Sequence, residues 1–363
     1  MSRINTSAGA GEGPAPDPRH IIAADAPLRK AFEMLNALSG GNMTLFAVDA
    51  SGHLAGSLTD GDLRRAVIAG LPLDAPVDRA CHKECLALPP GADRYEVIRR
   101  ARRLGISMLP ATDREGRVAS LIDLRRVRNA LPIDAVLMAG GRGERLRPLT
   151  DTCPKPLLEV GGKAIIDYNV DELLANGVRH IYVTVNYLHE QIERHFADPR
   201  FEGRVSCVLE PRRLGTMGSL SLIPGLTEET VLVMNSDLLT TLDFEKMFLA
   251  HAAAGAELTM AAVPYTVSVP FAIIEAEGRR ITGLTEKPTY NYFANAGVYM
   301  MRREVARSIP AGEYLDAPDL VDSLIRRGRR VDYFPVEGTW VDIGSPDDFR
   351  YANELMTAGA RRR

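Results

Sequence analysis

The sequence predicts an α/β domain built on a Rossmann-like, mixed and mainly parallel sheet, preceded by a smaller α+β domain. From Ile133 onward, short apolar runs alternate with helical patterns, which is typical of a sheet with parallel connections. Between His20 and about Arg128, two similar segments follow one another. A chain of 363 residues is long enough for about two such domains.

Composition and charge limit the classes of function. Hydrophobic residues make up 45% and charged residues 25% of the chain, so most of it is expected to fold. Lys and Arg total 44 against 47 Asp and Glu, and the formal net charge of -3 provides no field that attracts nucleic acid or an anionic membrane. No apolar run reaches the roughly 18 residues of a membrane span, and the N-terminus lacks the apolar core of a secretory signal. We therefore expect a cytoplasmic protein without nucleic-acid or membrane partners.

The N-terminus and the cysteines contribute little to the predicted fold. Residues 1–19 are dominated by Ser, Gly, Ala and Pro, so we expect a flexible tail. The four cysteines are too sparse for a disulfide scaffold and are expected to be reduced. Cys81, His82 and Cys85 have the residue types of a metal site, but no second ligand pair at zinc-finger spacing follows. A loop and a helix start are the favoured interpretation of this segment.

An internal repeat organises residues 20–130. Residues 45–55 align with residues 109–119, and each copy has the pattern of a strand, an acidic and glycine-containing turn, and a second strand. A helical pattern precedes each copy, at residues 28–38 and 95–104, and a charged helix start follows each. The repeat predicts one pseudo-symmetric α+β domain.

The first copy continues from Gly56 to Arg65 in a way that resembles the end of a CBS motif, a paired module that often binds adenine nucleotides. The resemblance implies that Thr59 and Asp62 meet the ribose or phosphate of such a ligand. The second copy has Asp123 and Arg126 at these positions, so at most one cleft keeps the expected pair. A second interpretation, compatible with the first, is that Thr59 is the N-cap of a helix with Asp62 in its first turn.

The predicted sheet of the second domain begins with a buried strand at residues 135–138, a helix at 164–176 that stops at Gly177, and a strand at 181–185. The alternation continues at residues 189–196, 205–209, 218–223 and 231–234. The residues Asn235-Ser236-Asp237 follow the last of these strands. Ligands of open α/β sheets bind beyond the carboxyl ends of strands, so the loop after Met138 and Asp237 are expected to face one crevice.

The glycines Gly140, Gly141 and Gly143 follow the first buried strand. Without a Cβ, their backbone N–H groups can approach phosphate oxygens closely, and Arg145 and Lys155 add positive charge. The spacing does not match the dinucleotide-binding fingerprint or the P-loop. A local phosphate-binding loop is therefore predicted.

The string from Ala139 to Leu157 resembles the signature of the sugar-1-phosphate nucleotidyltransferases, and the resemblance extends from about Ile133 to Ala358. It implies that residues 131–363 form one GT-A-like nucleotidyltransferase domain. Further motifs occur in the family's order: Gly215 and Gly218 in a nucleotide-binding turn, Asp237 and Asp342 as metal ligands, Glu286 and Lys287 as a sugar-phosphate clamp, and Asn295 on a sugar-contacting strand. One departure is Glu144, where Thr or Ser is common, and an acid there must point away from the triphosphate or be paired.

The resemblance implies a separate role for each of these charged residues, and these roles agree with physical chemistry. In-line attack of a sugar phosphate on an α-phosphorus brings two anions together, so the site must neutralise charge. Asp237 and Asp342 are suited to bind Mg²⁺. Arg145 and the glycine amides would hold the departing phosphates, and Lys155 would lie near the transferred one. Taken singly, each aspartate is as well explained as a helix or turn cap, and each lysine as an exposed loop residue.

We expect an enzyme that transfers a nucleoside monophosphate from a triphosphate to a sugar 1-phosphate and releases pyrophosphate. Transferases of this kind with a CBS pair resemble guanylyltransferases, which favours GTP, while uridylyl, thymidylyl and cytidylyl transfer remain alternatives. The CBS pair would bind an adenine nucleotide, regulate the enzyme or mediate a homo-oligomer. The competing hypothesis is a non-catalytic nucleotide sensor, which would be expected to lose charged residues that this chain retains.

Overall fold

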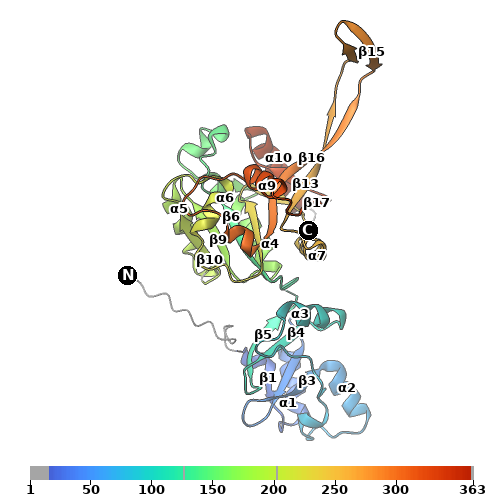
Figure 1. Ribbon diagram of the computed structural model, residues 1–363. Coiled ribbons are helices and arrows are strands. Elements are labelled where there is room, and N and C mark those ends of the chain that lie inside the picture. The colour runs from blue at the N-terminus through green and yellow to red at the C-terminus, as the bar shows by residue number, and fades with distance from the viewer. Residues whose placement is uncertain (1–15, 126, 202, 361–363) are drawn as a thin grey trace. The chain divides into compact units, whose positions relative to one another are not determined.

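The computed structural model describes residues 16–125, 127–201 and 203–360 (Figure 1). The tertiary contacts divide the chain between Ala130 and Leu131 into two units. Most of the predicted tail lies outside the described residues, but its last part is structured: Asp17 caps a short 3-10 helix, η1, at Pro18–His20. No helix of the described residues is long and apolar enough to cross a bilayer.

The first unit contains the two predicted copies. The first copy comprises β1 (Ile21–Ala23), α1 (Leu28–Ala37), β2 (Thr44–Val48), β3 (Leu54–Thr59) and α2 (Asp60–Ile68), followed by η2 (Val77–Arg79). The second comprises α3 (Arg94–Arg103), β4 (Met108–Thr112) and β5 (Val118–Asp123). The β2–β3 and β4–β5 pairs are both antiparallel, and both have a register shift close to the turn. The hairpins of the repeat are thus confirmed.

The two copies differ after their second strand. In the first copy α2 follows β3 directly, whereas no helix follows β5 in the described residues up to Ala130. The prediction of a second charged helix start was therefore wrong. Asp123 accepts a hydrogen bond from the backbone N–H of Arg125 at 3.0 Å and pairs with the Arg125 guanidinium, so its carboxylate closes a local turn. Arg126 lies outside the described residues.

A seven-stranded mixed sheet forms the centre of the second unit, in the order β10-β9-β6-β11-β16-β13-β17. Its strands are β6 (Ile133–Met138), β9 (Ile181–Val185), β10 (Val205–Leu209), β11 (Thr230–Asn235), β13 (Leu258–Ser268), β16 (Thr289–Arg302) and β17 (Val331–Pro335). Neighbours pair in parallel from β10 to β11 and between β13 and β17, while β16 is antiparallel to both of its neighbours. The prediction of a mixed, mainly parallel sheet is confirmed.

Helices and short strands surround this sheet. The helices are α4 (Ile165–Ala175), α5 (His189–Phe196), α6 (Gly215–Gly218), α7 (Phe244–Ala254), α8 (Arg303–Arg307), α9 (Ala317–Arg326) and α10 (Pro346–Ala360). Short 3-10 helices occur at η3 (Glu144–Leu146), η4 (Leu149–Asp151), η5 (Lys155–Leu157), η6 (Pro199–Phe201) and η7 (Ser219–Leu222). Small two-stranded sheets join β7 (Glu159–Val160) to β8 (Lys163–Ala164) and β12 (Leu238–Thr240) to β18 (Trp340–Asp342).

Burial explains why the sequence pattern identified these elements. The first five residues of β6 and of β11 are buried, and all of β9 is. Such continuous apolar runs are typical of strands covered on both faces. α4 ends where predicted, because Gly177 adopts the left-handed φ of 78° that follows many helix ends.

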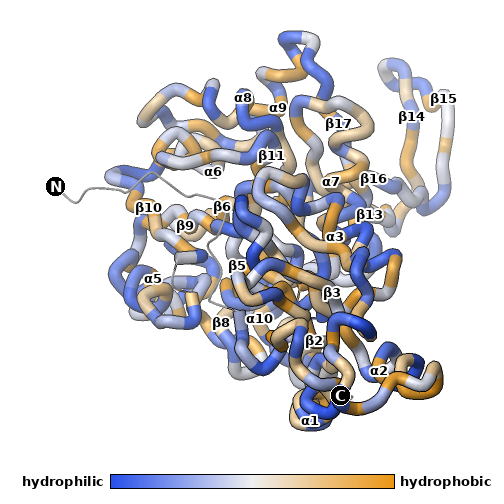
Figure 2. Tube along the Cα trace, turned by 90° about the horizontal axis from the view of Figure 1, so that it is seen from below, coloured by the Kyte–Doolittle hydropathy of each residue, from blue (hydrophilic) through white to orange (hydrophobic). Residues whose placement is uncertain are grey.

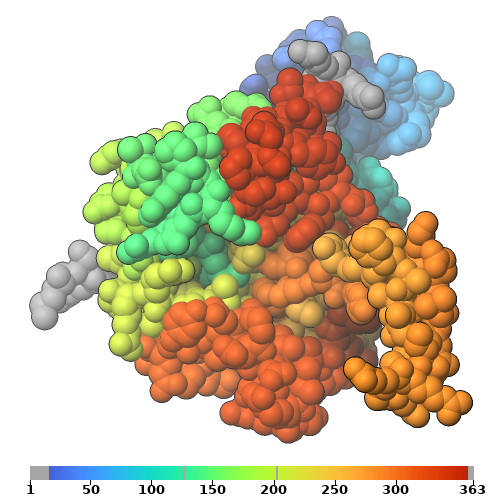
Figure 3. Space-filling model, turned by 90° about the horizontal axis from the view of Figure 1, so that it is seen from above, coloured from blue at the N-terminus to red at the C-terminus, as the bar shows by residue number. Residues whose placement is uncertain are grey.

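A long hairpin extends beyond the sheet. The C-terminal part of β13 and the N-terminal part of β16 continue as a two-stranded ribbon, which carries a second hairpin of β14 (Ile273–Glu277) and β15 (Arg280–Thr285). We call residues 264–293 the arm. Figures 1 and 3 show the arm projecting from the rest of its unit.

A buried carboxylate joins α4 to the α5–η6 segment. Asp167 accepts hydrogen bonds from His195 at 2.6 Å and from Arg200 at 2.8 Å, and its side chain is only 4% exposed. Burial alone would raise the pKa of Asp167, but its hydrogen bonds and charge interactions with His195 and Arg200 outweigh burial and hold the pKa below its usual value. The carboxylate therefore stabilises the fold in its ionised form.

This ion cluster predicts a dependence of stability on pH. A carboxyl whose pKa is lower in the folded chain contributes stability above its unfolded pKa of about 3.9, and this contribution is lost as the pH falls through the folded value. We expect Asp167→Asn to lower the free energy of unfolding by about 1–3 kcal/mol at pH 7 and by less at pH 3. Urea unfolding at both pH values measures this. Asp171→Asn, on the exposed side of the same helix, is the control, and an equal loss at both pH values would contradict the prediction.

Candidate active site

The carboxyl ends of β6 and β11 lie side by side because the two strands pair in parallel, with Asn235 opposite Met138. The Ser236 hydroxyl donates a hydrogen bond of 2.7 Å to the carbonyl oxygen of Met138, which joins the two strand ends directly. The buried Asn169 on α4 donates to the carbonyl of Ser236 at 3.2 Å. The glycine loop after Met138 and the residue Asp237 are therefore held at one edge of the sheet.

A cavity of about 340 Å³ opens at this edge, and we call it the first cavity. Its lining residues come from the glycine loop, η5, the turn before α6, the end of β11 and the turn after β18. They are Met138, Ala139, Gly141, Arg142, Gly143, Glu144, Arg145, Leu146, Lys155, Pro156, Arg213, Ser236, Asp237 and Gly344. Four Arg or Lys residues among them make the first cavity suitable for a polyanion.

The three glycines of the loop differ in what a side chain at each position would contact. Gly143 has a left-handed φ of 62°, and a β-carbon there would lie 2.9 Å from Cγ2 of Thr150, whose hydroxyl donates to the Gly143 carbonyl at 2.9 Å. A β-carbon at Gly140 would lie 2.8 Å from Oε1 of Glu210. At Gly141 a β-carbon would meet nothing within 4 Å. Gly143 and Gly140 are thus needed for packing, while Gly141 faces the open cavity.

Lys155 links the two predicted metal aspartates. Its side chain is only 11% exposed, and its ammonium group forms an ion pair with Asp237 and lies 3.9 Å from Asp342. A buried ammonium is stable only beside such carboxylates. The fold thus brings Lys155 next to two residues that are 82 and 187 positions away from it in the sequence.

The pairing of β12 with β18 brings the two aspartates together. Leu238 is opposite Asp342 in this antiparallel pair, and the N–H of Ile343 donates to the Asp237 carbonyl at 3.2 Å. Burial raises the pKa of Asp342, and the Asp237 carboxylate raises it further, while Lys155 and Arg145 oppose both. A cation beside Asp342 therefore favours the ionised form of this carboxyl.

The donor set fits a magnesium ion. Oδ1 of Asp237 is buried and has no hydrogen-bond partner among the described residues. A buried carboxylate oxygen without a partner costs free energy unless a ligand satisfies it. Mg²⁺ is commonly bound by one or two carboxylates, with phosphate oxygens and water completing its shell. No group of three or more His, Cys, Asp or Glu side chains suited to a metal occurs among the described residues, so substrate oxygens would have to complete this site.

A second cavity of about 340 Å³ involves the other side of Asp342, and we call it the second cavity. It is lined by Thr216, Asn235, Asn295, Ala296, Gly297, Tyr299, Asp316, Ala317, Pro318, Trp340 and Asp342. The Asn295 amide donates to the Tyr299 hydroxyl at 2.6 Å and accepts from the N–H of Gly297 at 2.9 Å. Hydroxyl, amide and carboxylate groups with one indole are suited to a sugar. None of these described lining residues is Lys or Arg.

The predicted nucleotide-binding turn is packed against another loop. A β-carbon at Gly218 would lie 2.3 Å from the carbonyl oxygen of Glu313, and one at Gly215 would lie 2.6 Å from that of Leu315. Neither glycine is among the residues that line the two cavities. Thr216, between them, does line the second cavity, and its N–H donates to Asp316 at 3.0 Å. The glycines therefore allow the close approach of two loops.

The structure does not bring Glu286 and Lys287 to either cavity. Both are exposed on the arm, in the short segment between β15 and β16, and Lys287 adopts a left-handed φ of 42°. Glu144, in contrast, is exposed and lines the first cavity, and the ion pairs of the described residues do not include it. The expected pairing of Glu144 with an arginine is therefore not found among the described residues, and the expectation that its carboxylate points away from a bound triphosphate stays a prediction.

Sequence reasoning missed several lining residues. Arg213 lies in the first cavity, and Asp316, Tyr299 and Trp340 lie in the second. Asp316 accepts hydrogen bonds from Thr216 and from the Tyr314 hydroxyl, the latter at 2.6 Å. Tyr299 and Trp340 lay within the motif segments 295–299 and 340–344, which were the available signal for them. Arg213 directly precedes the segment 214–220 and Asp316 lies in no motif, so neither was identified from the sequence.

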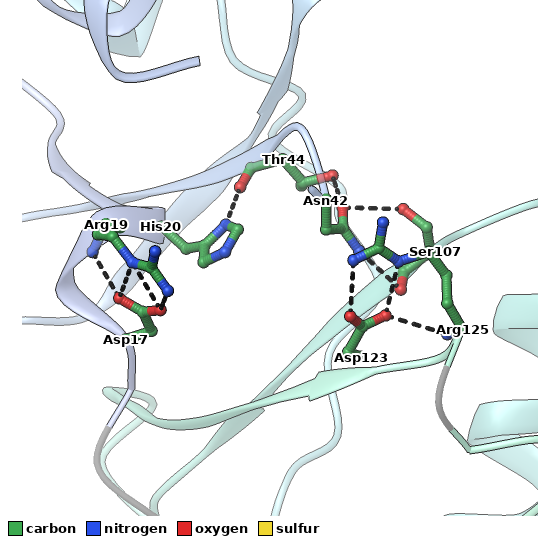
Figure 4. A network of polar contacts seen from close by, with 8 residues as sticks. All are labelled: Asp17, Arg19, His20, Asn42, Thr44, Ser107, Asp123 and Arg125. Carbon is green, nitrogen blue, oxygen red and sulfur yellow. Dashed lines mark hydrogen bonds and ion pairs between the residues drawn. The ribbon is translucent and has the colours of Figure 1, made fainter. Parts of the chain in front are cut away.

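Two polar clusters of the first unit are paired within the protein. Thr59 and Asp62 form a capping box: the Asp62 carboxylate accepts from the Thr59 N–H at 2.8 Å and from its hydroxyl at 2.6 Å. Figure 4 shows a second network, in which the buried Asn42 joins the two copies through Ser107. The helix-cap interpretation of Thr59 and Asp62 is confirmed.

The second unit of the chain is similar to known proteins. The sequence profile of the family described as nucleotidyl transferase matches residues 134–359. A Sulfolobus acidocaldarius protein, provisionally named a mannose-1-phosphate guanyltransferase, is 30% identical over 230 residues, covering 62% of this chain and 64% of that protein. The mannose-1-phosphate guanylyltransferase catalytic subunit beta of Danio rerio is 32% identical over 224 residues, covering 59% of this chain and 62% of that protein. The chain thus spans somewhat less than two thirds of these relatives.

A solved structure shows a similar fold. It is a protein of Bacillus anthracis provisionally named a glucose-1-phosphate thymidylyltransferase, with 20% identity and a TM-score of 0.50. The match covers 62% of this chain and 95% of that protein. At this level of identity the likeness concerns the fold alone.

Proposed function

The chain belongs to the nucleotidyl transferase family, and on this premise we propose that it transfers a nucleoside monophosphate from a nucleoside triphosphate to a sugar 1-phosphate. The observation that carries the proposal is the convergence of Lys155, Asp237 and Asp342 between a cationic cavity and a polar one. The first cavity suits the triphosphate and the second suits the sugar.

The proposed reaction needs no redox partner and no covalent enzyme intermediate. A phosphate oxygen of the sugar 1-phosphate attacks the α-phosphorus of the triphosphate and forms a new P–O bond. The bond between the α-phosphorus and the bridging oxygen breaks, and the electron pair leaves with pyrophosphate. Because the attacking phosphate is already ionised near neutral pH, no general base is required. This agrees with cavities lined by cations, carboxylates, amides and hydroxyls.

The residues of the first cavity would bind and orient the triphosphate. The glycine loop presents backbone N–H groups, with Gly141 open to the cavity, and Arg145 lies close to Gly344 on the opposite wall. These groups would hold the β- and γ-phosphates that leave. Lys155, at the boundary of the two cavities, would hold the transferred phosphate between both reactants.

Asp237 and Asp342 would hold Mg²⁺, with the unpartnered Oδ1 of Asp237 as one ligand. When bound, this ion would neutralise charge on the phosphate oxygens as the reaction proceeds. Lys155 would then move from its ion pair with Asp237 toward the phosphates, because the metal replaces it as the partner of the carboxylates.

Relatives that are about 30% identical to this chain are named mannose-1-phosphate guanyltransferase or guanylyltransferase. These names favour GTP as the nucleotide. The base is not fixed by any contact described above, so uridylyl, thymidylyl and cytidylyl transfer are the alternatives to test. Pyrophosphate release from the full chain with Mg²⁺ tests the proposal, with five nucleoside triphosphates against mannose, glucose, glucosamine, N-acetylglucosamine and heptose 1-phosphates. One dominant pair supports transfer. Silence across the panel, with triphosphate still bound, would favour a non-catalytic sensor.

We further propose that the first unit is a CBS pair that binds an adenine nucleotide near Thr59 and Asp62. The helix–strand–strand repeat supports this, and the capping box still leaves a carboxylate oxygen of Asp62 shared only with Arg65. We expect saturable heat with AMP or ATP in calorimetry of the full chain with its transferase site filled by GTP. Asp62→Ala should weaken this binding about 10-fold or more. Asp60→Ala, on the same turn, is the control, and unchanged binding in Asp62→Ala would overturn the assignment.

A further inference from the structure

The arm has no core of its own. Every residue from Pro264 to Phe293 is at least partly exposed, and none is buried. Its large hydrophobic side chains are among the most exposed in the second unit, with Phe271 at 73%, Leu284 at 63% and Ile281 at 60%. Figure 2 shows hydrophobic colouring along β14. An isolated two-stranded hairpin is marginally stable in water, so the arm requires a partner surface.

The ribbon at the base of the arm has one apolar face. Tyr265 is opposite Tyr292, and Val267 is opposite Tyr290, so these four side chains share a face. The rings of Tyr290 and Tyr292 stack at a centroid distance of 6.4 Å. The other face begins with Pro264 opposite Phe293, whose ring lies 4.9 Å from that of Tyr333 on β17. Beyond this pair it is polar, with Thr266 hydrogen bonded to Asn291 and Ser268 to Thr289.

The tip of the arm repeats this division. Ile274 is opposite Leu284, and Ala276 is opposite Ile281. Ile274 and Ala276 share a face because side chains alternate along β14, and a register shift between Glu275 and Ala276 places Ile281, as well as Leu284, opposite one of them. These directly paired residues therefore share one face of the tip. Both parts of the arm therefore present an apolar face that nothing in the described chain covers.

The arm cannot bring Lys287 into the second cavity of its own chain without breaking the hydrogen bonds between β13 and β16. The β13–β16 ladder is continuous from Ala262 opposite Asn295 to Ser268 opposite Thr289. Asn295 lines the second cavity, and the extended strand from Asn295 back to Thr289 covers six residue steps, or about 20 Å. Lys287 lies beyond this end of β16. A stiff ribbon keeps Lys287 away from the cavity of its own chain.

Charge favours a second copy of the chain as the partner that binds the arm. The acidic residues Glu275, Glu277 and Glu286 of the arm balance the basic residues Arg279, Arg280 and Lys287, so two arms do not repel each other. The second cavity contains Asp316 and Asp342 but no Lys or Arg among its described lining residues. A sugar phosphate bound there meets no cation among these lining residues besides the nearby Lys155, and the exposed Lys287 of another chain can supply a second one.

We propose that two copies of this chain exchange their arms, so that the apolar face of each arm packs on the other copy and Lys287 enters that copy's second cavity. Each complete site would then contain Asp237 and Asp342 of one chain and Lys287 of the other. A two-fold axis makes both contacts identical. The role of Lys287 in binding the sugar phosphate rests on the function proposed above, whereas the exchange of arms does not.

Hybrid dimers test the shared site. Lys287→Ala and Asp237→Asn chains with different affinity tags are co-expressed, and the hybrid is isolated by purification on both tags in turn. Each variant alone should be nearly inactive, while the hybrid should have about half of the parent activity, because one of its two sites is intact. An inactive hybrid, or no hybrid at all, would overturn the exchange of Lys287. If the parent protein itself is inactive, the proposed function fails and the oligomeric state decides the rest.

Sedimentation of the full chain tests the apolar contact without any activity. The parent should be a dimer, and Leu284→Glu, on the apolar face of the tip, should shift it toward monomer by at least about 10-fold in dissociation constant. Thr285→Glu places the same charge on the adjacent, opposite-facing residue and should leave the dimer intact. Both side chains are exposed, so neither change threatens the fold. A monomeric parent, or equal effects of the two substitutions, would contradict the proposal.

Discussion

Asp237→Asn should lower pyrophosphate release by about 100- to 1,000-fold while leaving the fold intact. Asparagine keeps the size of the side chain but removes the negative charge that would bind Mg²⁺. In the parent, Oδ1 of Asp237 is buried and has no hydrogen-bond partner in the described part of the chain, so it would offer Mg²⁺ a free oxygen ligand. The variant should also require a higher Mg²⁺ concentration for half-maximal rate. Steady-state kinetics over a Mg²⁺ titration measures both effects.

The control for this substitution is Asp243→Asn. Asp243 is the N-cap of α7 and accepts a hydrogen bond from the Lys246 N–H at 3.0 Å, and asparagine caps helices about equally well. Its rate and Mg²⁺ dependence should be unchanged. If Asp237→Asn folds normally and retains full turnover, the assignment of Asp237 to the metal site is incorrect.

Lys155→Ala should have opposite effects on metal binding and on turnover. The Lys155 ammonium forms an ion pair with Asp237 and lies 3.9 Å from Asp342. Removing this competing cation should tighten the binding of Mg²⁺ alone, measured by calorimetry without nucleotide. Turnover should still fall about 100-fold or more, because the transferred phosphate loses its positive partner.

These opposite directions separate the chemical role of Lys155 from a structural one. Lys163→Ala is the control, since Lys163 is paired with Asp171 at 2.5 Å on a more exposed surface. That variant should bind Mg²⁺ and turn over like the parent. Weaker Mg²⁺ binding in Lys155→Ala would show that the lysine organises the carboxylates instead of competing for them.

Local pattern predicted the elements of the second unit closely. The strands at 181–185 and 205–209 and the helix at 189–196 have the bounds that the sequence indicated. Each is defined by burial of its own residues and by nearby turn or cap residues, which are local properties. The predicted helix after Asp123 is missing from the described residues, which shows the limit of prediction from local pattern. In a sequence, a carboxylate that closes a turn with Arg125 looks the same as one that caps a helix.

The candidate site was only partly predictable. The glycine loop and the position of Asp237 followed from strand ends, and the resemblance to a family added Asp342. That Lys155 lies between the two aspartates follows from the β12–β18 pairing, which no local pattern contains. Arg213 and Asp316 had no motif around them, so only the cavities identified them.

The sequence by itself determined that the chain is long enough for two domains and that the second domain has a mainly parallel sheet. It also determined which residue types are present for a phosphate site. These depend on composition, periodicity and turn chemistry, which act over a few residues. The tertiary structure decided which charges meet. It packed Gly215 and Gly218 against the 313–316 loop, and it extended the ribbon that carries Lys287 away from the cavities. Contacts between residues far apart in sequence arise from strand pairing and packing, so their outcome appears only in the folded chain.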